Sequence, residues 1–189
     1  MSTQSNYNLP NLVSAIRLLM APVLLALAIM QQPEWFIWAL VFTVFTDVLD
    51  GFLARTLNQI TELGSHLDSW GDFAVYTVMA ISALVLWEEI VYQEITSFII
   101  IVMSFTVPVI IGLIKFKAIT SYHTWSVKLA VGLTIISYVL LFSELASWPF
   151  KVAAIACAYA GIEEILISLI LKHERVDVRT LWHAIKYNR

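Results

Sequence analysis

The stretch Asp47–Phe73, DVLDGFLARTLNQITELGSHLDSWGDF, places four aspartates inside an otherwise apolar chain. Apolar residues make up 60% of the 189 residues and charged residues 13%, which is about half the usual charged share of a soluble domain. The mean hydropathy is +0.81. Such a chain has too much apolar surface to bury in one water-soluble domain, so we expect the lipid bilayer to be its solvent.

Six apolar segments approach the ~20 residues that span the hydrocarbon core of a bilayer. Lipid offers backbone groups no hydrogen-bonding partner, so each segment is expected to be a helix. The sequence therefore predicts an all-α, six-helix transmembrane domain over residues 1–171, with a short polar N-terminus at 1–11 and a polar tail at 172–189. The segments are Leu12–Met30, Trp35–Leu53, Ser69–Trp87, Ile95–Ile114, Val127–Phe142 and Trp148–Leu171.

The basic residues predict the orientation of these spans. Six spans place both termini on one side, and of the eleven Lys and Arg residues only Lys151 falls on the other side. Basic residues gather on the cytoplasmic side of membrane proteins. We therefore expect a multi-pass protein of the cell (inner, cytoplasmic) membrane with both termini in the cytoplasm. The acidic stretch borders the same face.

The net charge and the cysteine content argue against two features, a nucleic-acid partner and a disulfide within the chain. A net charge of −3 is too small to indicate a nucleic-acid partner. The single cysteine, Cys157, lies in an apolar run and has no second cysteine in the chain to form a disulfide with.

Helical spacing arranges the aspartates as two pairs, each on one helical face. Asp47 and Asp50 lie three residues apart, and Asp68 and Asp72 lie four residues apart. The polar residues 58–62 between the pairs can form a turn, so two antiparallel helices can direct both pairs at each other. The small residues on the same faces are Gly51, Ala54 and Gly64.

Four packed carboxylates repel one another and favour cations between them. Mg²⁺ and Mn²⁺ prefer oxygen ligands and complete their coordination with phosphate oxygens and water. Two such ions, about 3.5–4 Å apart, can clamp a displacement at phosphorus. Arg55 follows the first helical stripe and can bind a phosphate in bidentate fashion. The sequence thus predicts a two-ion site that acts on a phosphate.

These residues also match, at every spacing, the pattern D-x2-D-G-x2-A-R-x8-G-x3-D-x3-D. This pattern is the signature of the CDP-alcohol phosphotransferase (CDP-alcohol phosphatidyltransferase) family, which the chain therefore resembles. At residue usages of roughly 5–8%, eight fixed positions match by chance at about 10⁻¹⁰ per starting point. The motif covers the 26 residues from Asp47 to Asp72, and the six-segment layout is similar to the family along the rest of the chain.

The resemblance implies roles for individual residues. The four aspartates would hold two divalent ions, Mg²⁺ or Mn²⁺, and Asp72 would also be the catalytic base that deprotonates the attacking hydroxyl. The reaction implied moves a phosphatidyl group from a CDP-linked lipid such as CDP-diacylglycerol to a small alcohol, phosphorylated or not, and releases CMP. The family also implies a homodimer. Positions implied to contact the CDP moiety are Pro10, Asn11, Gly51, Ala54, Arg55, Thr61 and Gly64.

Basic and polar residues near the expected cytoplasmic face are candidates for an acceptor pocket. Lysines flank residues 118–127, where they can bind a phosphate on the acceptor or simply anchor the membrane face. Arg17 lies inside the first segment, where a buried arginine favours an anion. It can bind a substrate, form a structural salt bridge, or extend its charged end to the membrane surface. The candidates are Arg17, Lys115, Lys117, Ser121, His123 and Lys128.

The identity of the acceptor stays open at this stage. The opening NLPNLVSAIRLLMAP resembles the start of bacterial phosphatidylglycerophosphate synthases, which favours glycerol 3-phosphate. Two departures weaken that assignment: Phe73 stands where those enzymes carry a basic residue, and the fourth segment has no arginine before Lys115. An inositol phosphate, serine or another small alcohol are the alternatives.

A rival from another class is a transporter of divalent cations or protons, which also places carboxylates in membrane helices. Glu163 and Glu164, inside the sixth segment, can line an ion path or pair with a cation such as Arg17. A transporter needs acids near the bilayer midplane with access from both sides. The aspartates instead gather at one face beside Gly and Arg residues suited to a nucleotide, which favours the enzyme.

Overall fold

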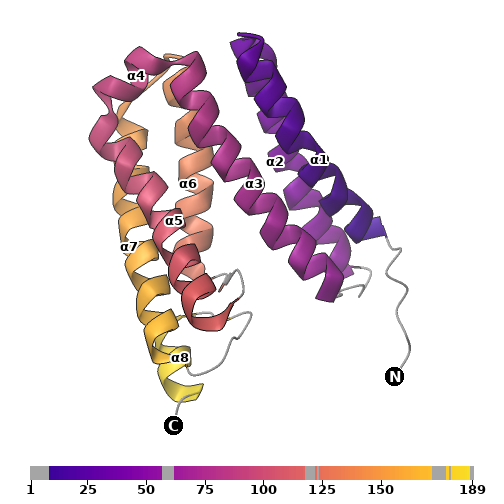
Figure 1. The fold of residues 1–189 in the computed structure, drawn as a ribbon, viewed down its shortest axis with the longest axis vertical. Helices are drawn as coiled ribbons and strands as arrows, with labels where there is room; N and C mark the ends of the chain where they lie inside the picture. The colour runs from indigo at the N-terminus through magenta and orange to yellow at the C-terminus, as the bar shows by residue number, and fades with distance from the viewer. Residues whose placement is uncertain are drawn as a thin grey trace. The chain divides into compact units, whose positions relative to one another are not determined.

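A computed structural model of the chain describes the backbone of residues 9–56, 62–117, 122, 124–171, 178 and 180–187. Side chains are described in these ranges except at 9–14, 48, 50–55, 62–69 and 187. Every regular element in these ranges is an α-helix (Figure 1), as the composition predicts. The helices are α1 Leu9–Ile29, α2 Pro33–Thr56, α3 Glu62–Leu86, α4 Glu88–Gln93, α5 Ile95–Phe116, α6 Trp125–Phe142, α7 Trp148–Ile170 and α8 Leu181–Tyr187.

The helices divide into two compact units, Met1–Glu88 and Glu89–Arg189. In the first unit, α1 packs against both α2 and α3. The α1–α2 turn closes through Gln31, whose φ of 56° lets Gln32 N donate to the Leu27 carbonyl at 3.0 Å. Pro33 then begins α2, a position where a missing N–H costs nothing. This tight turn makes α1 and α2 antiparallel neighbours.

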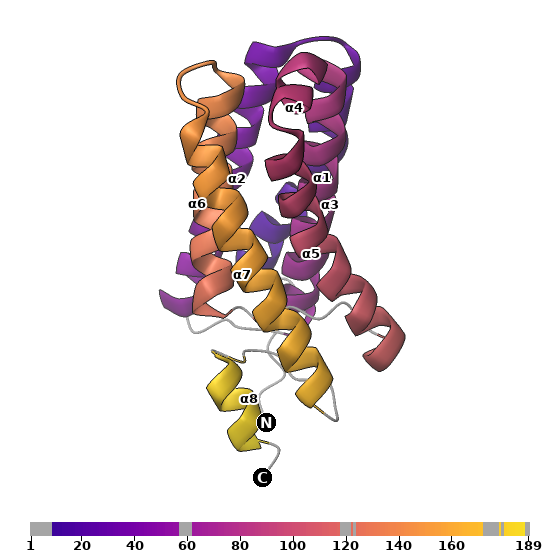
Figure 2. The same ribbon diagram turned by 90° about the vertical axis from the view of Figure 1, so that its left-hand side faces the viewer.

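The second unit is organised around α7, which packs against α5, α6 and α8 (Figure 2). Small residues allow this close packing. A Cβ added at Gly161 would lie 3.0 Å from the Ser104 carbonyl oxygen and 3.1 Å from Ser104 Cα on α5. Small residues that let backbones approach are typical of helix pairs in membranes. Gly161 therefore fixes the crossing of α5 and α7.

Among the described residues, α5, α6 and α7 are long and apolar enough to cross a membrane, and the shorter stretches Ala15–Ile29 and Trp70–Leu86 are also apolar. Large apolar side chains such as Ile114, Ile155 and Leu169 are exposed on these three helices. Exposed apolar surface on this scale fits a lipid environment. The count of six spans and the side of the termini stay predictions.

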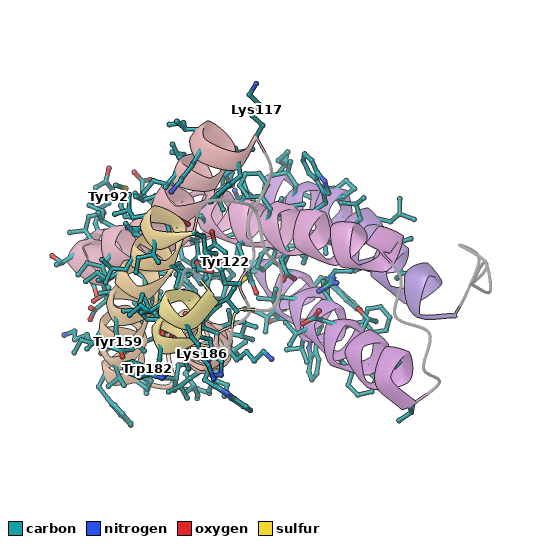
Figure 3. The ribbon with its side chains drawn as sticks, turned by 90° about the horizontal axis from the view of Figure 1, so that it is seen from below. Tyr92, Lys117, Tyr122, Tyr159, Trp182 and Lys186 are labelled. Atoms are coloured by element: carbon teal, nitrogen blue, oxygen red, sulfur yellow. The ribbon has the colours of Figure 1, made fainter. Side chains whose placement is uncertain are left out.

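The tail beyond residue 171 contains one short helix in its described part, α8. Ala184 on α8 is fully buried in a cluster with Tyr122, Ile167, Leu171 and Val178. Trp182 and Lys186 lie on the outer side of α8, whereas Tyr122 lies inside the unit (Figure 3). The tail is thus anchored to α7 by apolar packing.

Candidate active site

Arg17 on α1 joins the two ends of the aspartate motif. Its side chain is only 2% exposed, and its Nη1 atom donates to Asp47 Oδ1 on α2 and, at 2.8 Å, to Asp72 Oδ1 on α3. A buried arginine is costly unless it is paired with anions. Three helices therefore meet at one charged group. The anion that the sequence required near Arg17 is the carboxylate pair of the motif itself.

Gly71 makes room for this arrangement. A Cβ at Gly71 would lie 3.1 Å from Arg17 Nε and 3.6 Å from Arg17 Cζ. The absence of a side chain at this point on α3 lets the guanidinium reach the neighbouring residue, Asp72. Sequence reasoning missed this role, because the only signal is a glycine directly before the fourth aspartate, and an isolated glycine in a helix has many explanations.

The carboxylates keep partial access to their surroundings. Asp47 is 37% exposed and Asp72 is 29% exposed, in contrast to the buried arginine. Two carboxylates facing one guanidinium leave an excess of one negative charge among the three groups. Such a group can accept a further cation, and an unprotonated carboxylate in it can accept a proton from a nearby hydroxyl.

The other two aspartates lie on the same continuous helices. The backbone at Asp50 is helical in α2, and the backbone at Asp68 is helical in α3, so the predicted helical spacing of both pairs is confirmed. Their side chains lie outside the described residues. Among the side chains that are described, no group of three or more His, Cys, Asp or Glu could hold a metal ion. The four-aspartate ligand set therefore stays a prediction.

The positions expected to contact a nucleotide fall at the ends of these helices. Pro10 and Asn11 lie in the first turn of α1, and Gly64 lies in the first turn of α3. Gly51, Ala54 and Arg55 occupy the last two turns of α2. Their side chains are outside the described residues, and Thr61 lies wholly outside them. Their nucleotide role stays a prediction.

The acceptor-pocket lysines have different surroundings from one another. Lys115 Nζ donates to the main-chain carbonyls of Ser168 at 2.8 Å and Leu169 at 3.0 Å. These are carbonyls of the last turn of α7, which have no partner within an α-helix. Lys115 thus caps α7.

Lys117 and Lys128 have no such role in α7. Lys117 ends α5 with a φ of 58°, and its side chain points away from the helices (Figure 3). The Lys128 ammonium lies 5.5 Å from the centre of the Trp125 ring on its own helix. Ser121 and His123 lie outside the described residues. The acceptor pocket stays a prediction.

A second polar cluster surrounds Glu163 on α7. Its carboxylate accepts a hydrogen bond from Ser126 Oγ at the start of α6 and one from the Leu181 backbone N–H, at 3.0 Å, at the start of α8. Five residues later along α7, Ser168 Oγ and the Tyr122 hydroxyl share a hydrogen bond of 2.9 Å. These contacts hold the start of α6, the residues just before it and the start of α8 against α7. Among the residues that the structure describes, the hydrogen-bond partners of Glu163 are neutral donors.

Comparison with known proteins places the chain in a family. A family model described as CDP-alcohol phosphatidyltransferase matches residues 7–162. A CDP-diacylglycerol–glycerol-3-phosphate 3-phosphatidyltransferase of Haemophilus influenzae is 32% identical over 126 residues, which cover 65% of this chain and 61% of that protein. The Aquifex aeolicus protein of the same name is 38% identical over 65 residues, covering 34% of this chain and 36% of its own length.

A different activity is named among the relatives as well. A CMP-forming cardiolipin synthase of Rattus norvegicus is 35% identical over 82 residues, covering 43% of this chain and 27% of that protein. Each of these three matches covers less than two thirds of the relative's own length. No solved structure matches the chain. Because the family model matches residues 7–162, most of the chain and the segment with all four aspartates, the chain belongs to the CDP-alcohol phosphatidyltransferase family.

Proposed function

We propose that this chain is a membrane enzyme of phospholipid synthesis that transfers a phosphatidyl group from a CDP-linked lipid, such as CDP-diacylglycerol, to a small alcohol and releases CMP. The observation that carries the proposal is the convergence of Asp47 and Asp72, the first and last residues of the family motif, on one buried arginine. The names of the relatives, which include CDP-diacylglycerol and CMP, support the same donor and leaving group.

The residues fit a pair of divalent ions. The motif supplies only carboxylate oxygens, the ligands that Mg²⁺ and Mn²⁺ prefer. Asp47 and Asp72 converge, are partly exposed, and carry more negative charge than Arg17 neutralises. Asp47, Asp50, Asp68 and Asp72 would hold the ions. When bound, the ions neutralise charge on the diphosphate of the donor and on the departing CMP.

The chain's own groups would then act on the acceptor and the nucleotide. Asp72 accepts the proton of the acceptor hydroxyl as its oxygen forms a bond to the phosphorus of the lipid phosphate. The bond from that phosphorus to the CMP oxygen breaks, and CMP leaves with the electron pair. Arg55 binds the diphosphate as a bidentate donor. Gly51, Ala54 and Gly64 leave space for the nucleotide on the same helical faces.

The proposal includes a topology of six spans with both termini and the aspartates facing the cytoplasm, and a homodimer. In the described part of the chain, α5, α6 and α7 are long and apolar enough to span a membrane, and α1, α2 and α3 are 21, 24 and 25 residues long. The strong one-sided distribution of basic residues supports the orientation. Residues 1–171 would form one catalytic domain and 172–189 its cytoplasmic tail.

The test is CMP release by the purified full-length chain in detergent micelles. CDP-diacylglycerol is supplied with Mg²⁺ or Mn²⁺ and one of several acceptors: glycerol 3-phosphate, inositol 1-phosphate, serine or phosphatidylglycerol. We expect dication-dependent CMP release with one acceptor, with glycerol 3-phosphate as the first candidate, and loss of release with a chelator. Cation flux into proteoliposomes without CMP release for any acceptor would overturn the proposal and favour a transporter.

A further inference from the structure

The cation that holds Asp47 and Asp72 comes from the protein itself. A single nitrogen, Arg17 Nη1, donates to one oxygen of each carboxylate, although Asp47 lies 30 residues and Asp72 lies 55 residues from Arg17 in sequence. The arginine is buried, whereas both carboxylates are partly exposed. The guanidinium therefore approaches the acids from the inside of the first unit and leaves an accessible side of each acid open.

This arrangement is specifically accommodated by the fold. Gly71 lies against the Arg17 side chain, with its missing Cβ position 3.1 Å from Nε and 3.7 Å from Cδ. Without a cation between them, the two carboxylates would repel each other, and without anions the buried guanidinium would be strongly destabilised. Each of the three charged groups is thus stabilised by the other two.

We propose that Arg17 is the resident counterion of the candidate metal site: it holds Asp47 and Asp72 together in the ion-free protein and yields their oxygens when divalent ions bind. This inference rests on the proposed function, because it assumes that the same carboxylates bind divalent ions. The two cations compete for the same oxygens, and a guanidinium beside a doubly charged ion is repelled by it. Arg17 is therefore a positioning residue that also sets the affinity of the site for metal.

Two simpler roles for Arg17 predict different effects of its loss on stability and on metal affinity. Loss of a purely structural ion pair would destabilise the protein equally with and without metal. Loss of a residue that binds an acceptor phosphate would raise the KM of a phosphorylated acceptor and leave metal affinity unchanged. Loss of a resident counterion destabilises the ion-free protein and at the same time tightens the binding of divalent ions, which replace the missing charge.

The experiment measures Mn²⁺ binding by electron paramagnetic resonance and thermal unfolding by tryptophan fluorescence on the full-length chain in detergent. For Arg17→Gln we expect Mn²⁺ affinity to increase about tenfold, a typical coupling between two ligands. We also expect a lower melting temperature that saturating Mn²⁺ restores. Arg17→Lys keeps the charge but loses the planar fork, so its effects should be smaller in both measurements.

A matched pair of glycine variants perturbs Arg17 without removing it. In Gly71→Ala the new Cβ displaces the guanidinium by a few tenths of an ångström, because it would lie 3.1 Å from Nε. We expect a change in Mn²⁺ affinity in the same direction as in Arg17→Gln, but smaller. Gly132→Ala on α6 is the control, because its Cβ would meet no atom of the described structure within 4 Å, and it should behave as the unmodified chain.

The outcomes separate this inference from the proposed function. If the unmodified chain binds Mn²⁺ but Arg17→Gln binds it no more tightly, the resident-counterion inference is wrong and the enzyme proposal stands. If Arg17→Gln does not fold even with Mn²⁺, unchanged Mn²⁺ affinity in both Arg17→Lys and Gly71→Ala overturns the inference in the same way. If the unmodified chain binds no Mn²⁺, the metal site of the proposed function fails together with the inference.

Discussion

Each of the two units contains a polar cluster, and the charged side chain at its centre is stabilised by a different kind of partner in each. Arg17 in the first unit is met by two charged, partly exposed carboxylates, which leaves an excess of negative charge. Within the described part of the second unit, Glu163 accepts hydrogen bonds from a serine hydroxyl and a backbone N–H, which are neutral donors fixed by the local fold. Charges held by other charges can change partners when an ion arrives, whereas a carboxylate held by neutral donors fastens helices together. We therefore assign chemistry to the first cluster and anchoring to the second.

The largest expected effect comes from Asp72→Asn, which removes both a candidate base and a metal ligand. General bases contribute about 10²–10⁴-fold to a rate, so CMP release should fall at least about a hundredfold. The amide keeps an oxygen that can accept from Arg17, so the helical circular dichroism spectrum should be unchanged. Retention of more than a tenth of the activity would contradict the role given to Asp72.

Breaking the second cluster should affect stability and leave chemistry nearly intact. Glu163→Ala removes the acceptor of two hydrogen bonds from Ser126 and Leu181. Hydrogen bonds to charged groups are worth about 1.5–3 kcal/mol each, so losing two of them should lower the free energy of unfolding by at least about 3 kcal/mol in SDS titrations. CMP release per folded molecule, measured at a temperature below the transition, should stay within about twofold. A Glu163→Ala protein that is stable but inactive would contradict the anchoring role and indicate that Glu163 takes part in catalysis.

Packing within the second unit can be tested with a matched pair of glycines. Gly161→Ala inserts a Cβ 3.0 Å from the Ser104 carbonyl oxygen, and backbone atoms cannot move aside as a flexible side chain can. Overpacking of this kind costs about 1–3 kcal/mol. Gly132→Ala, which has open space, should stay within about 0.5 kcal/mol of the unmodified chain in the same SDS titration. Equal stabilities for the two variants would show that α5 and α7 do not cross at Gly161.

The smallest effect is expected at Lys115. The structure indicates that Lys115 caps α7, whereas the sequence predicted that it lines an acceptor pocket. Lys115→Met removes the cation that binds the last carbonyls of α7, and cations at helix C-termini contribute about 0.3–1 kcal/mol. We expect a small loss of stability and an unchanged KM for every acceptor. A KM that rises only for phosphorylated acceptors would instead place Lys115 in the acceptor pocket.

The parts of the fold that composition determines could be predicted from the sequence. The expected segments Ile95–Ile114, Val127–Phe142 and Trp148–Leu171 agree with α5, α6 and α7 to within two residues at each end. An apolar segment that is long enough to cross lipid can satisfy its backbone hydrogen bonds in few structures other than a helix. Helical spacing likewise predicted that each aspartate pair lies on one continuous helix, which α2 and α3 confirm.

The contacts between helices could not be predicted in the same way, because they depend on how each helix is rotated about its axis. The sequence indicated that Arg17 needs an anion but left open whether the anion is a substrate or a carboxylate. Its partners lie 30 and 55 residues away, and Glu163 bonds Leu181 across 18 residues. The importance of Gly71 follows only from the path of the Arg17 side chain.

The most direct test of the central claim is the number of Mn²⁺ ions that the purified chain binds, measured by electron paramagnetic resonance. The account predicts two ions per chain with a spin-coupled spectrum, since two ions sharing carboxylates lie about 3.5–4 Å apart. In a double variant with Asp47→Asn and Asp72→Asn, this coupled pair should be lost. No bound Mn²⁺ in the unmodified chain, or an unchanged coupled spectrum in the double variant, would contradict it.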